Sequence, residues 1–212
     1  MAREDIIKKH KAAGVVFVDE NNVDETVLIG DGTVVEPNVR ITGSTKIGRN
    51  ALIGFCSDIA NCEIGDNVTV KHSVLTDSKI GAGTNIGPFA YVRPNCCVGE
   101  NVKLGDFVEI KNSNIGDGTK LAHLTYVGDA DVGKHINFGC GTVVVNYDGK
   151  NKHRTVIEDG AFIGCNTNLV SPVTVGENAY TAAGSTITED VPADTLAIAR
   201  ARQVIKDNWK RK

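Results

Sequence analysis

The sequence is short of aromatic residues, of long apolar runs and of any excess of one charge. Aromatic residues make up 5% of the 212 positions, and the formal net charge is −3. This near balance of charges gives no support for a nucleic-acid partner. No stretch approaches the ~18 continuous apolar residues of a membrane span, and the N-terminal MAREDIIKKHKAAG has no apolar secretory segment. We therefore expect a cytoplasmic protein with no membrane span.

Cysteine is present, but not in a pattern typical of disulfides or metal sites. No CxxC spacing occurs among the six cysteines, which are Cys56, Cys62, Cys96, Cys97, Cys140 and Cys165. The adjacent pair Cys96 and Cys97 suits neither a zinc knuckle nor an ordinary bridge. We predict that the cysteines are small apolar core residues in a reducing compartment and that no metal is bound.

The sequence does contain much glycine and a repeat of aliphatic residues. Glycine accounts for 23 of 212 residues, about 11% against a usual ~7%. Isoleucine and valine greatly outnumber the aromatic residues, which favours short strands and tight turns. Residues that are almost all aliphatic recur every six positions, with the interval shifted in places: Ile29, Val35, Ile41, Ile47, Ile53, Ile59; Ile80, Ile86, Val92, Val98, Leu104, Ile110; Ile115, Leu121, Val127; Val132, Phe138, Val144; Ile157, Ile163, Leu169, Val175, Thr181, Ile187.

This six-residue period has a direct structural interpretation. A small or β-branched residue often lies two positions before the aliphatic one, as in residues 45–47 (TKI) and 84–86 (TNI). Alternate residues of a strand face one side, so both of these side chains point inward and a following glycine can form a corner. Six residues are too few for a strand and a helical crossover, and the period fits neither 3.5 nor 3.6. The chain is therefore predicted to be all-β, wound as a parallel β-helix with stacked aliphatic ladders.

Both ends of the chain leave this pattern. Residues 3–12 (REDIIKKHKA) predict a short charged helix, and the residues beyond Asp190 are basic and lack the repeat. We therefore divide the chain into an N-terminal helical arm at residues 1–20, a β-helix at 21–190 and a C-terminal arm at 191–212.

Five segments are more specific than the repeat. They are GPFAYVRP (87–94), GDFVEIKNS (105–113), HLTYVGDADVG (123–133), GCGTVVVNYDGKNKHRT (139–155) and LAIARARQ (196–203). These segments closely resemble the acetyltransferase half of the bifunctional N-acetylglucosamine-1-phosphate uridyltransferase/glucosamine-1-phosphate acetyltransferase family. The resemblance covers nearly the whole chain and is strongest from residue 87 to residue 203. Even KKHKAAGVVFVD (8–19) resembles the arm that joins the family's two halves.

The resemblance implies a fold and an activity. Members of this family form left-handed β-helix homotrimers and transfer acetyl from acetyl-CoA to the 2-amino group of glucosamine 1-phosphate. The product serves UDP-N-acetylglucosamine and cell-wall precursor synthesis. The family's uridyltransferase half opens with a glycine-rich LAAGxGTxM phosphate loop, which this sequence does not contain. We therefore expect acetyl transfer without uridylyl transfer, by either an excised domain or a free-standing relative.

Acetyl transfer to an amine needs a base, because an ammonium group has no lone pair with which to attack a thioester. Histidine titrates near neutral pH and suits this task. Of the five histidines, His123 in HLTY matches the family's catalytic base. Without the motif, a surface or structural histidine would be the default interpretation.

The resemblance also implies binding residues. The positions that match the family's sugar-phosphate contacts are Arg93, Lys111, Tyr126, Asn137 and Lys152. The positions that match its acetyl-CoA contacts are Cys140, Asn146, Tyr147, Cys165, Ala183 and Arg200. Arginine and lysine suit a phosphate, whereas Cys165 replaces a serine of other members with a weaker hydrogen-bond donor.

The segment from Asn146 to Thr155 interrupts the repeat with an NYDG turn and several cationic residues. The faces of a β-helix offer little concavity, and binding sites need it. We interpret this segment as a loop, turning at Asp148-Gly149, that closes a pocket against a neighbouring rod.

Three other functions are weighed against this one. A zinc-dependent carbonic anhydrase would need three clustered imidazoles, and the five histidines lack a suitable spacing. A non-catalytic β-helix could serve as an assembly module, or the enzyme could acetylate another amino or hydroxy sugar. Within the enzyme class, Cys140 or Cys165 could act as a covalent nucleophile, but inward small positions of the repeat explain both residues.

Overall fold

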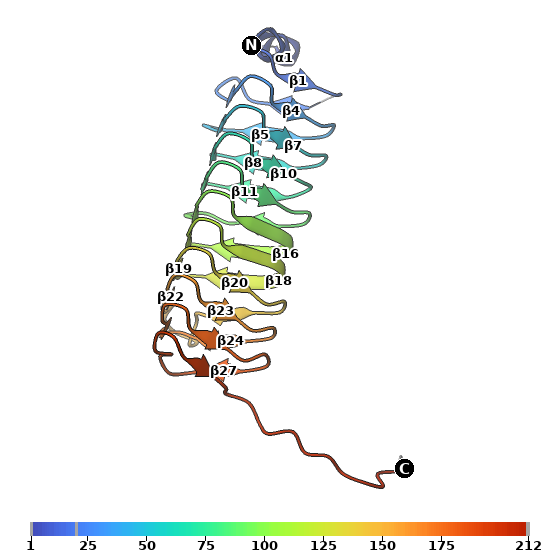
Figure 1. The fold of residues 1–212 in the computed structure, drawn as a ribbon. Helices are drawn as coiled ribbons and strands as arrows, with labels where there is room; N and C mark the ends of the chain where they lie inside the picture. Colours follow the sequence, from blue (N-terminus) through green and yellow to red (C-terminus); the bar gives the residue numbers. More distant parts are fainter. Residues whose placement is uncertain (1, 20, 211–212) are drawn as a thin grey trace.

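The protein is a rod of short strands wound around a narrow apolar core. The computed structural model describes residues 2–19 and 21–210. Helix α1 (Arg3–Ala12) lies at one end of the rod, and the chain then winds coil by coil toward the other end (Figure 1). The fold is a left-handed parallel β-helix, which confirms the architecture predicted from the repeat and the family resemblance.

The strands stack into three columns, which we call the first, second and third face of the rod. Two long strands, β16 (Lys103–Lys111) and β18 (Lys120–Gly128), belong to both the first and the second face. The other strands of the first face are β1 (Val16–Phe17), β4 (Val34–Val35), β7 (Leu52–Ile53), β10 (Thr69–Val70), β13 (Asn85–Ile86), β20 (Asn137–Phe138), β23 (Phe162–Ile163), β26 (Tyr180–Thr181) and β28 (Leu196–Ala197). The other strands of the second face are β2 (Asn22–Val23), β5 (Arg40–Thr42), β8 (Asp58–Ala60), β11 (Val74–Thr76), β14 (Tyr91–Val92), β21 (Val143–Val145), β24 (Asn168–Val170) and β27 (Thr186–Ile187).

The third face is a separate nine-stranded sheet. Its strands are β3 (Leu28–Ile29), β6 (Lys46–Ile47), β9 (Glu63–Ile64), β12 (Lys79–Ile80), β15 (Cys97–Val98), β17 (Asn114–Ile115), β19 (Ala130–Val132), β22 (Thr155–Ile157) and β25 (Val173–Val175). Each strand pairs in parallel with the equivalent strand one coil away. Residues 16 to 18 positions apart therefore become neighbours, as Asp106 and His123 do, and the separation rises to 25 where a coil contains the loop after β21. This register decides which polar side chains meet on the surface.

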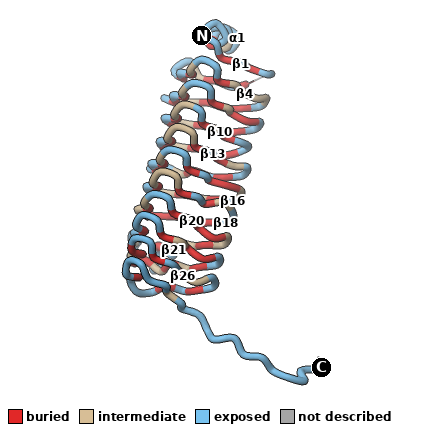
Figure 2. Tube along the Cα trace, in the orientation of Figure 1, coloured by how far each residue is buried: buried red, intermediate tan, exposed pale blue. Residues whose placement is uncertain are grey.

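The core is built from the aliphatic ladders. Every residue of the series that recurs at six-residue intervals is buried, and Figure 2 shows buried segments recurring in each coil along the rod. Ile110 and Leu121 are examples with no or almost no exposed surface. Truncating one such residue to alanine would cost about 2–5 kcal/mol of stability.

Small inward hydroxyl groups complete the hydrogen bonding of the coils. Thr84 Oγ1 donates to the carbonyl of Gly99 at 2.9 Å and accepts from the backbone N–H of Val102 at 3.1 Å. Thr119 makes the equivalent pair of bonds to Gly133 and Ile136. These hydroxyls satisfy backbone groups that would otherwise be buried without a partner, which explains the small polar residue of the repeat.

The prediction for the cysteines is right for two of them and wrong for others. Cys62 and Cys96 are buried, and desolvation raises the pKa of the Cys62 thiol to about 11. Cys56, Cys97 and Cys165 are exposed and Cys140 is half-buried, because these four occupy outward or corner positions of their coils. All six are free thiols, and the inward-position explanation of Cys140 and Cys165 is therefore wrong.

The β-helix extends beyond both of its predicted boundaries, residues 21 and 190. β1 pairs with β4 near the start, and β28 pairs with β26 near the end. Ala199 still exchanges hydrogen bonds with Ser185 and Thr186, and residues 201–210 then leave the rod as an exposed, extended tail (Figure 1). Residues 1, 20, 211 and 212, which the predicted arms include, lie outside the described residues. Within the described part, no helix is long and apolar enough to cross a membrane.

Candidate active site

The first and second faces meet at an edge that we call the first corner. β18 rounds this corner at His123 and Leu124, and β16 rounds it at the equivalent position, with Asp106 paired to His123. Extending the register from Phe138, Ile163 and Thr181 places three further residues below His123 in successive coils. These are Cys140, Cys165 and Ala183, so three of the predicted acetyl-CoA residues follow the predicted base along one edge.

His123 is held at this corner by a carboxylate. Its Nδ1 lies 2.7 Å from Oδ1 of Asp106, and more than half of the imidazole is exposed. The hydrogen bond to His123 is the largest cause that lowers the pKa of Asp106 below its ordinary value, so the carboxylate is ionised and can only accept a hydrogen bond.

An apolar ridge runs along the first corner toward the imidazole. Phe89, Phe107 and Leu124 are 51%, 56% and 56% exposed, and all three have a positive φ. The rings of Phe89 and Phe107 stack with centroids 5.4 Å apart, and the His72 ring packs against Phe89 at 4.7 Å, tilted by 52°. Large side chains rarely adopt this backbone conformation, so the corner projects apolar groups outward at a conformational cost.

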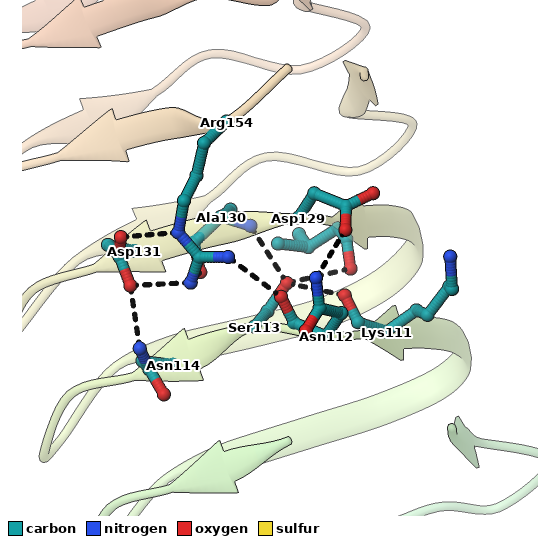
Figure 3. Close-up of polar contacts among 9 residues, drawn as sticks. Lys111, Asn112, Ser113, Asn114, Asp129, Ala130, Asp131 and Arg154 are labelled. Atoms are coloured by element: carbon teal, nitrogen blue, oxygen red, sulfur yellow. Dashed lines mark hydrogen bonds and ion pairs between the residues drawn. The ribbon is translucent and has the colours of Figure 1, made fainter. Parts of the chain in front are cut away.

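The second and third faces meet at an edge that we call the second corner, where Asp129 is buried. Its carboxylate accepts hydrogen bonds from the side-chain amides of Asn112 and Asn146. Burial by itself raises the pKa of Asp129, but these two bonds and the charges of Lys111 and Lys152 lower it below its ordinary value. Asp129 is therefore a buried, ionised carboxylate that links side chains of neighbouring coils at this corner. Figure 3 shows it beside Asn112.

Cations gather around this corner. The pKa of Lys111 is lowered, first by contact with the side chain of Lys152, then by desolvation and by the positive charges of Lys152 and Arg93. Arg93 itself donates to Oε1 of Glu109 at 2.8 Å and is 38% exposed. Like charges held this close attract an anion, because an incoming phosphate relieves their repulsion.

Tyr126 lies on the second face between the two corners. Its hydroxyl reaches the second corner, since a β-carbon on Gly128 would lie 2.3 Å from Tyr126 Oη and 2.9 Å from Asn146 Nδ2. Glycine is therefore required at position 128 for the phenol and the amide to approach each other.

The segment after Asn146 forms a compact loop, as its sequence suggested. Asp148 accepts hydrogen bonds from the backbone N–H groups of Asn151 and Lys150 at 2.7 Å each, and His153 Nε2 lies 2.7 Å from its other oxygen. These contacts, led by the bond from Asn151, lower the pKa of Asp148 to about 2. Tyr147 pairs with Lys152 across the loop, is more than half exposed, and donates its hydroxyl to the carbonyl of Gly149 at 2.8 Å.

Arg154 fixes the returning end of this loop to the rod. Its guanidinium donates to both oxygens of Asp131, at 2.5 and 2.6 Å, and to the carbonyls of Asn112 and Ala130 at 3.2 Å (Figure 3). Asn114 donates to the same Asp131 carboxylate at 2.6 Å. The loop is thus anchored at its start through Asn146 and at its end through Arg154.

The predicted site residues fall into two groups at opposite edges of the second face. His123, Cys140, Cys165 and Ala183 follow the first corner, and Arg200 joins them because its side chain passes over the Gly184 turn. The second group surrounds Asp129 and contains Arg93, Lys111, Tyr126, Asn146, Tyr147 and Lys152. Asn137 lies on the first face, between Lys120 and Phe162, and does not join the other predicted sugar-phosphate residues within the chain.

Motif matching missed the residues that hold the two groups in place. Asp106, Asp129 and Arg154 lie inside the quoted segments, yet their partners are 17 to 23 positions away in sequence. The length of one coil is the signal that could have found them, because it predicts that residue 123 stacks on residue 106. Among residues 2–19 and 21–210, no cluster of three or more His, Cys, Asp or Glu side chains is arranged to hold a metal ion.

Comparison with known protein families finds a match to the repeat in two segments of the chain. Residues 77–112 and 154–189 match the bacterial transferase hexapeptide (six repeats). These two segments therefore carry the hexapeptide repeat of this family of transferases, and it is the same repeat that buries the aliphatic ladders.

The individual relatives are more specific. The chain is 52% identical over 212 residues to the bifunctional protein GlmU of Clostridioides difficile, and 58% identical over 209 residues to that of Acetivibrio thermocellus. These matches cover 99% and 98% of this chain but 46% and 45% of the relatives. The chain thus spans about half the length of the relatives it matches, and the resemblance to their C-terminal half is confirmed.

Solved structures share the fold at much lower identity. The UDP-N-acetylglucosamine acyltransferase of Francisella novicida is 19% identical with a TM-score of 0.60, over 87% of this chain and 67% of that one. The Arabidopsis UDP-N-acetylglucosamine acyltransferase is 16% identical with a TM-score of 0.52, over 87% and 67%. At this level of identity, the two similarities show a shared β-helix fold and nothing more specific.

Proposed function

We propose that this chain transfers the acetyl group of acetyl-CoA to the 2-amino group of glucosamine 1-phosphate. The observation that carries the proposal is the arrangement of the second face. One edge bears an imidazole held by a carboxylate, the other bears three cations, and a tyrosine lies between them. The identity to GlmU relatives supports the same activity.

The acceptor would lie across the second face. Five positions along β18 separate His123 from Gly128 at the second corner, which is at most about 17 Å of strand. The imidazole and the lysine side chains shorten this gap from both ends. Arg93, Lys111 and Lys152 would bind the phosphate, and the sugar amine would then face His123, with Tyr126 supplying a neutral hydrogen bond.

The chemistry needs one base and no covalent enzyme intermediate. His123 takes a proton from the ammonium group, and the neutral amine attacks the thioester carbonyl to form a tetrahedral intermediate. The nitrogen of this intermediate loses its second proton to solvent. Collapse then breaks the carbon–sulfur bond, and the leaving thiolate takes the first proton back from the imidazolium. The product is N-acetylglucosamine 1-phosphate with free CoA, which would serve UDP-N-acetylglucosamine and cell-wall precursor synthesis in the cytoplasm.

Acetyl-CoA would bind along the first corner. Cys140, Cys165 and Ala183 follow His123 at one residue per coil, a run of about 14 Å at ~4.8 Å per coil. Arg200 beyond them would pair with the coenzyme's phosphates. Asn137 and Tyr147 would reach the coenzyme or sugar from a neighbouring rod, whereas buried Asn146 would act by holding Asp129 and the start of the loop in place.

We further propose that the protein forms a homotrimer. The exposed ridge of Phe89, Phe107 and Leu124 supports this, because apolar side chains this exposed favour a partner surface. Their spacing equals that of the coils, which suits another copy packed in parallel. A ring of three identical rods would set one corner of each against its neighbour and cover the open second face.

The test is an acceptor panel. Purified protein is incubated with acetyl-CoA and with glucosamine 1-phosphate, glucosamine, glucosamine 6-phosphate and other amino and hydroxy sugars, and free thiol is followed. We expect release with glucosamine 1-phosphate and little with sugars that lack the anomeric phosphate. Preference for a different sugar would keep the class and change the acceptor, whereas no release with any acceptor would favour an assembly module.

A further inference from the structure

We infer that Asp106 is a positioning residue for acetyl transfer, which fixes the tautomer of His123 so that Nε2 is the basic nitrogen. This inference rests on the proposed function, but it concerns a carboxylate that motif matching did not single out. Asp106 lies one coil before His123 at the same register position, and the two side chains meet at 2.7 Å.

The direction of the hydrogen bond follows from the charges. The pKa of Asp106 is held below its ordinary value, so near neutral pH the carboxylate has no proton to donate. The shared proton must then belong to His123 Nδ1, and a neutral imidazole carries only one N–H. The lone pair therefore lies on Nε2, the nitrogen turned away from Asp106 and available to a substrate amine.

The corner leaves Asp106 free for this task. Register extended from Leu104 places Pro88 on the other side of Asp106, and proline carries no side-chain donor that would compete for the carboxylate. The next residue beyond His123 along the corner is Cys140, a thiol. The imidazole is thus the side-chain hydrogen-bond partner that this edge offers to Asp106, beside the backbone N–H of Asp106 itself. The carboxylate also stabilises the imidazolium that forms when His123 takes the proton.

Two substitutions separate the effects of the hydrogen bond and of the charge. Asp106→Ala removes both, and we expect kcat to fall about ten- to a hundredfold with the KM values for acetyl-CoA and sugar within about twofold. Asp106→Asn keeps an oxygen that accepts from Nδ1, and we expect an intermediate kcat. Glu63→Ala, which removes an exposed carboxylate paired with Lys79 on the third face, is the matched control and should leave kcat unchanged.

The tautomer is read directly by nitrogen NMR of histidine-labelled protein. We expect the Nδ1–H form of His123 in the unmodified protein and in Asp106→Asn, and a shift toward the Nε2–H form in Asp106→Ala. An unchanged tautomer in Asp106→Ala, or a change in KM alone, would overturn the inference. This spectrum can be recorded without any enzymatic turnover. If the protein acetylated no sugar, the proposed function would be wrong, but the spectrum would still show whether Asp106 sets the tautomer of His123.

Discussion

At the scale of single residues, the clustering of Lys111 with other cations is the feature with the clearest chemical consequence. Its lowered pKa means that Lys111 loses its proton at a lower pH than an ordinary lysine, whose pKa is about 10.4. A neutral amine no longer attracts a phosphate. The binding of an anionic acceptor should therefore weaken on the alkaline side earlier than lysine chemistry alone would suggest.

This argument predicts the pH dependence of Lys111→Arg. Arginine stays charged up to a pH above 12, so the alkaline rise in the KM for glucosamine 1-phosphate should move to higher pH in this variant. The measurement is KM between about pH 7 and 10. Lys79→Arg on the third face should follow the unmodified protein, and identical pH profiles for all three would show that Lys111 does not bind the phosphate.

The sequence predicted individual residues unevenly, for a physical reason. His123, Lys111 and Tyr126 were proposed as site residues because they match specific motifs, and the structure places the last two near one buried carboxylate. Asp129 escaped notice since nothing in a local sequence shows that a carboxylate will be buried under two amides from adjacent coils. Exposed Cys165 was misjudged because corner positions tolerate small residues as readily as inward positions do.

At the scale of elements, the anchored loop after β21 is the feature that most distinguishes this rod from a plain repeat. Asn146 ties its start to Asp129, and Arg154 ties its end to Asp131. The loop carries Tyr147 and Lys152 between these two anchors. Its position therefore depends on polar contacts rather than on the aliphatic core.

We predict that Arg154→Met raises the KM for the sugar phosphate several-fold, because Lys152 is then held less firmly. Stability should fall by no more than about 1 kcal/mol, since both members of the Arg154–Asp131 pair are about 40% exposed. Arg49→Met removes a similar two-pronged pair with Asp66, far from the loop, and serves as the control. Equal KM values in the two variants would show that the anchor does not position Lys152.

The elements themselves were largely predictable. A six-residue period can only place strands two or three residues long around a common axis, and β6 and β13 are such strands. The two nine-residue strands were not predicted, since the repeat gives no sign that β16 and β18 stay hydrogen-bonded around the first corner. The contacts that anchor the loop, from Asn146 to Asp129 and from Arg154 to Asp131, were also not predicted, because they depend on the register between coils.

At the scale of the whole molecule, the rod has one apolar edge, the ridge at the first corner, and two groups of candidate site residues at opposite edges of the second face. The third face lies opposite the first corner, so a trimer built around the apolar ridge would leave that face outside. Neighbouring rods would then cover the open second face and exclude water from the thioester.

We predict that Phe107→Glu breaks this assembly while leaving the rod folded. The ring is 56% exposed in the single chain, so its replacement costs little core packing, but a charge in an apolar interface is strongly unfavourable. Sedimentation should show three chains in the unmodified protein and one in the variant, with acetyl transfer lost. Leu28→Glu, at an exposed position of the third face, should remain trimeric. A trimeric, fully active Phe107→Glu protein would exclude the ridge from the interface.

The most direct measurement is the rate of CoA release from acetyl-CoA with glucosamine 1-phosphate, compared between the unmodified protein and His123→Ala. Removing a general base typically costs about 10²–10⁴ in rate, and His123 is exposed, so the variant should lose this factor in kcat while keeping its fold and oligomeric state. Acceptor-dependent release in the unmodified protein that falls by that factor in His123→Ala is the predicted result. Release at an equal rate in both proteins would contradict the role of His123, and no acceptor-dependent release in either would contradict the activity itself.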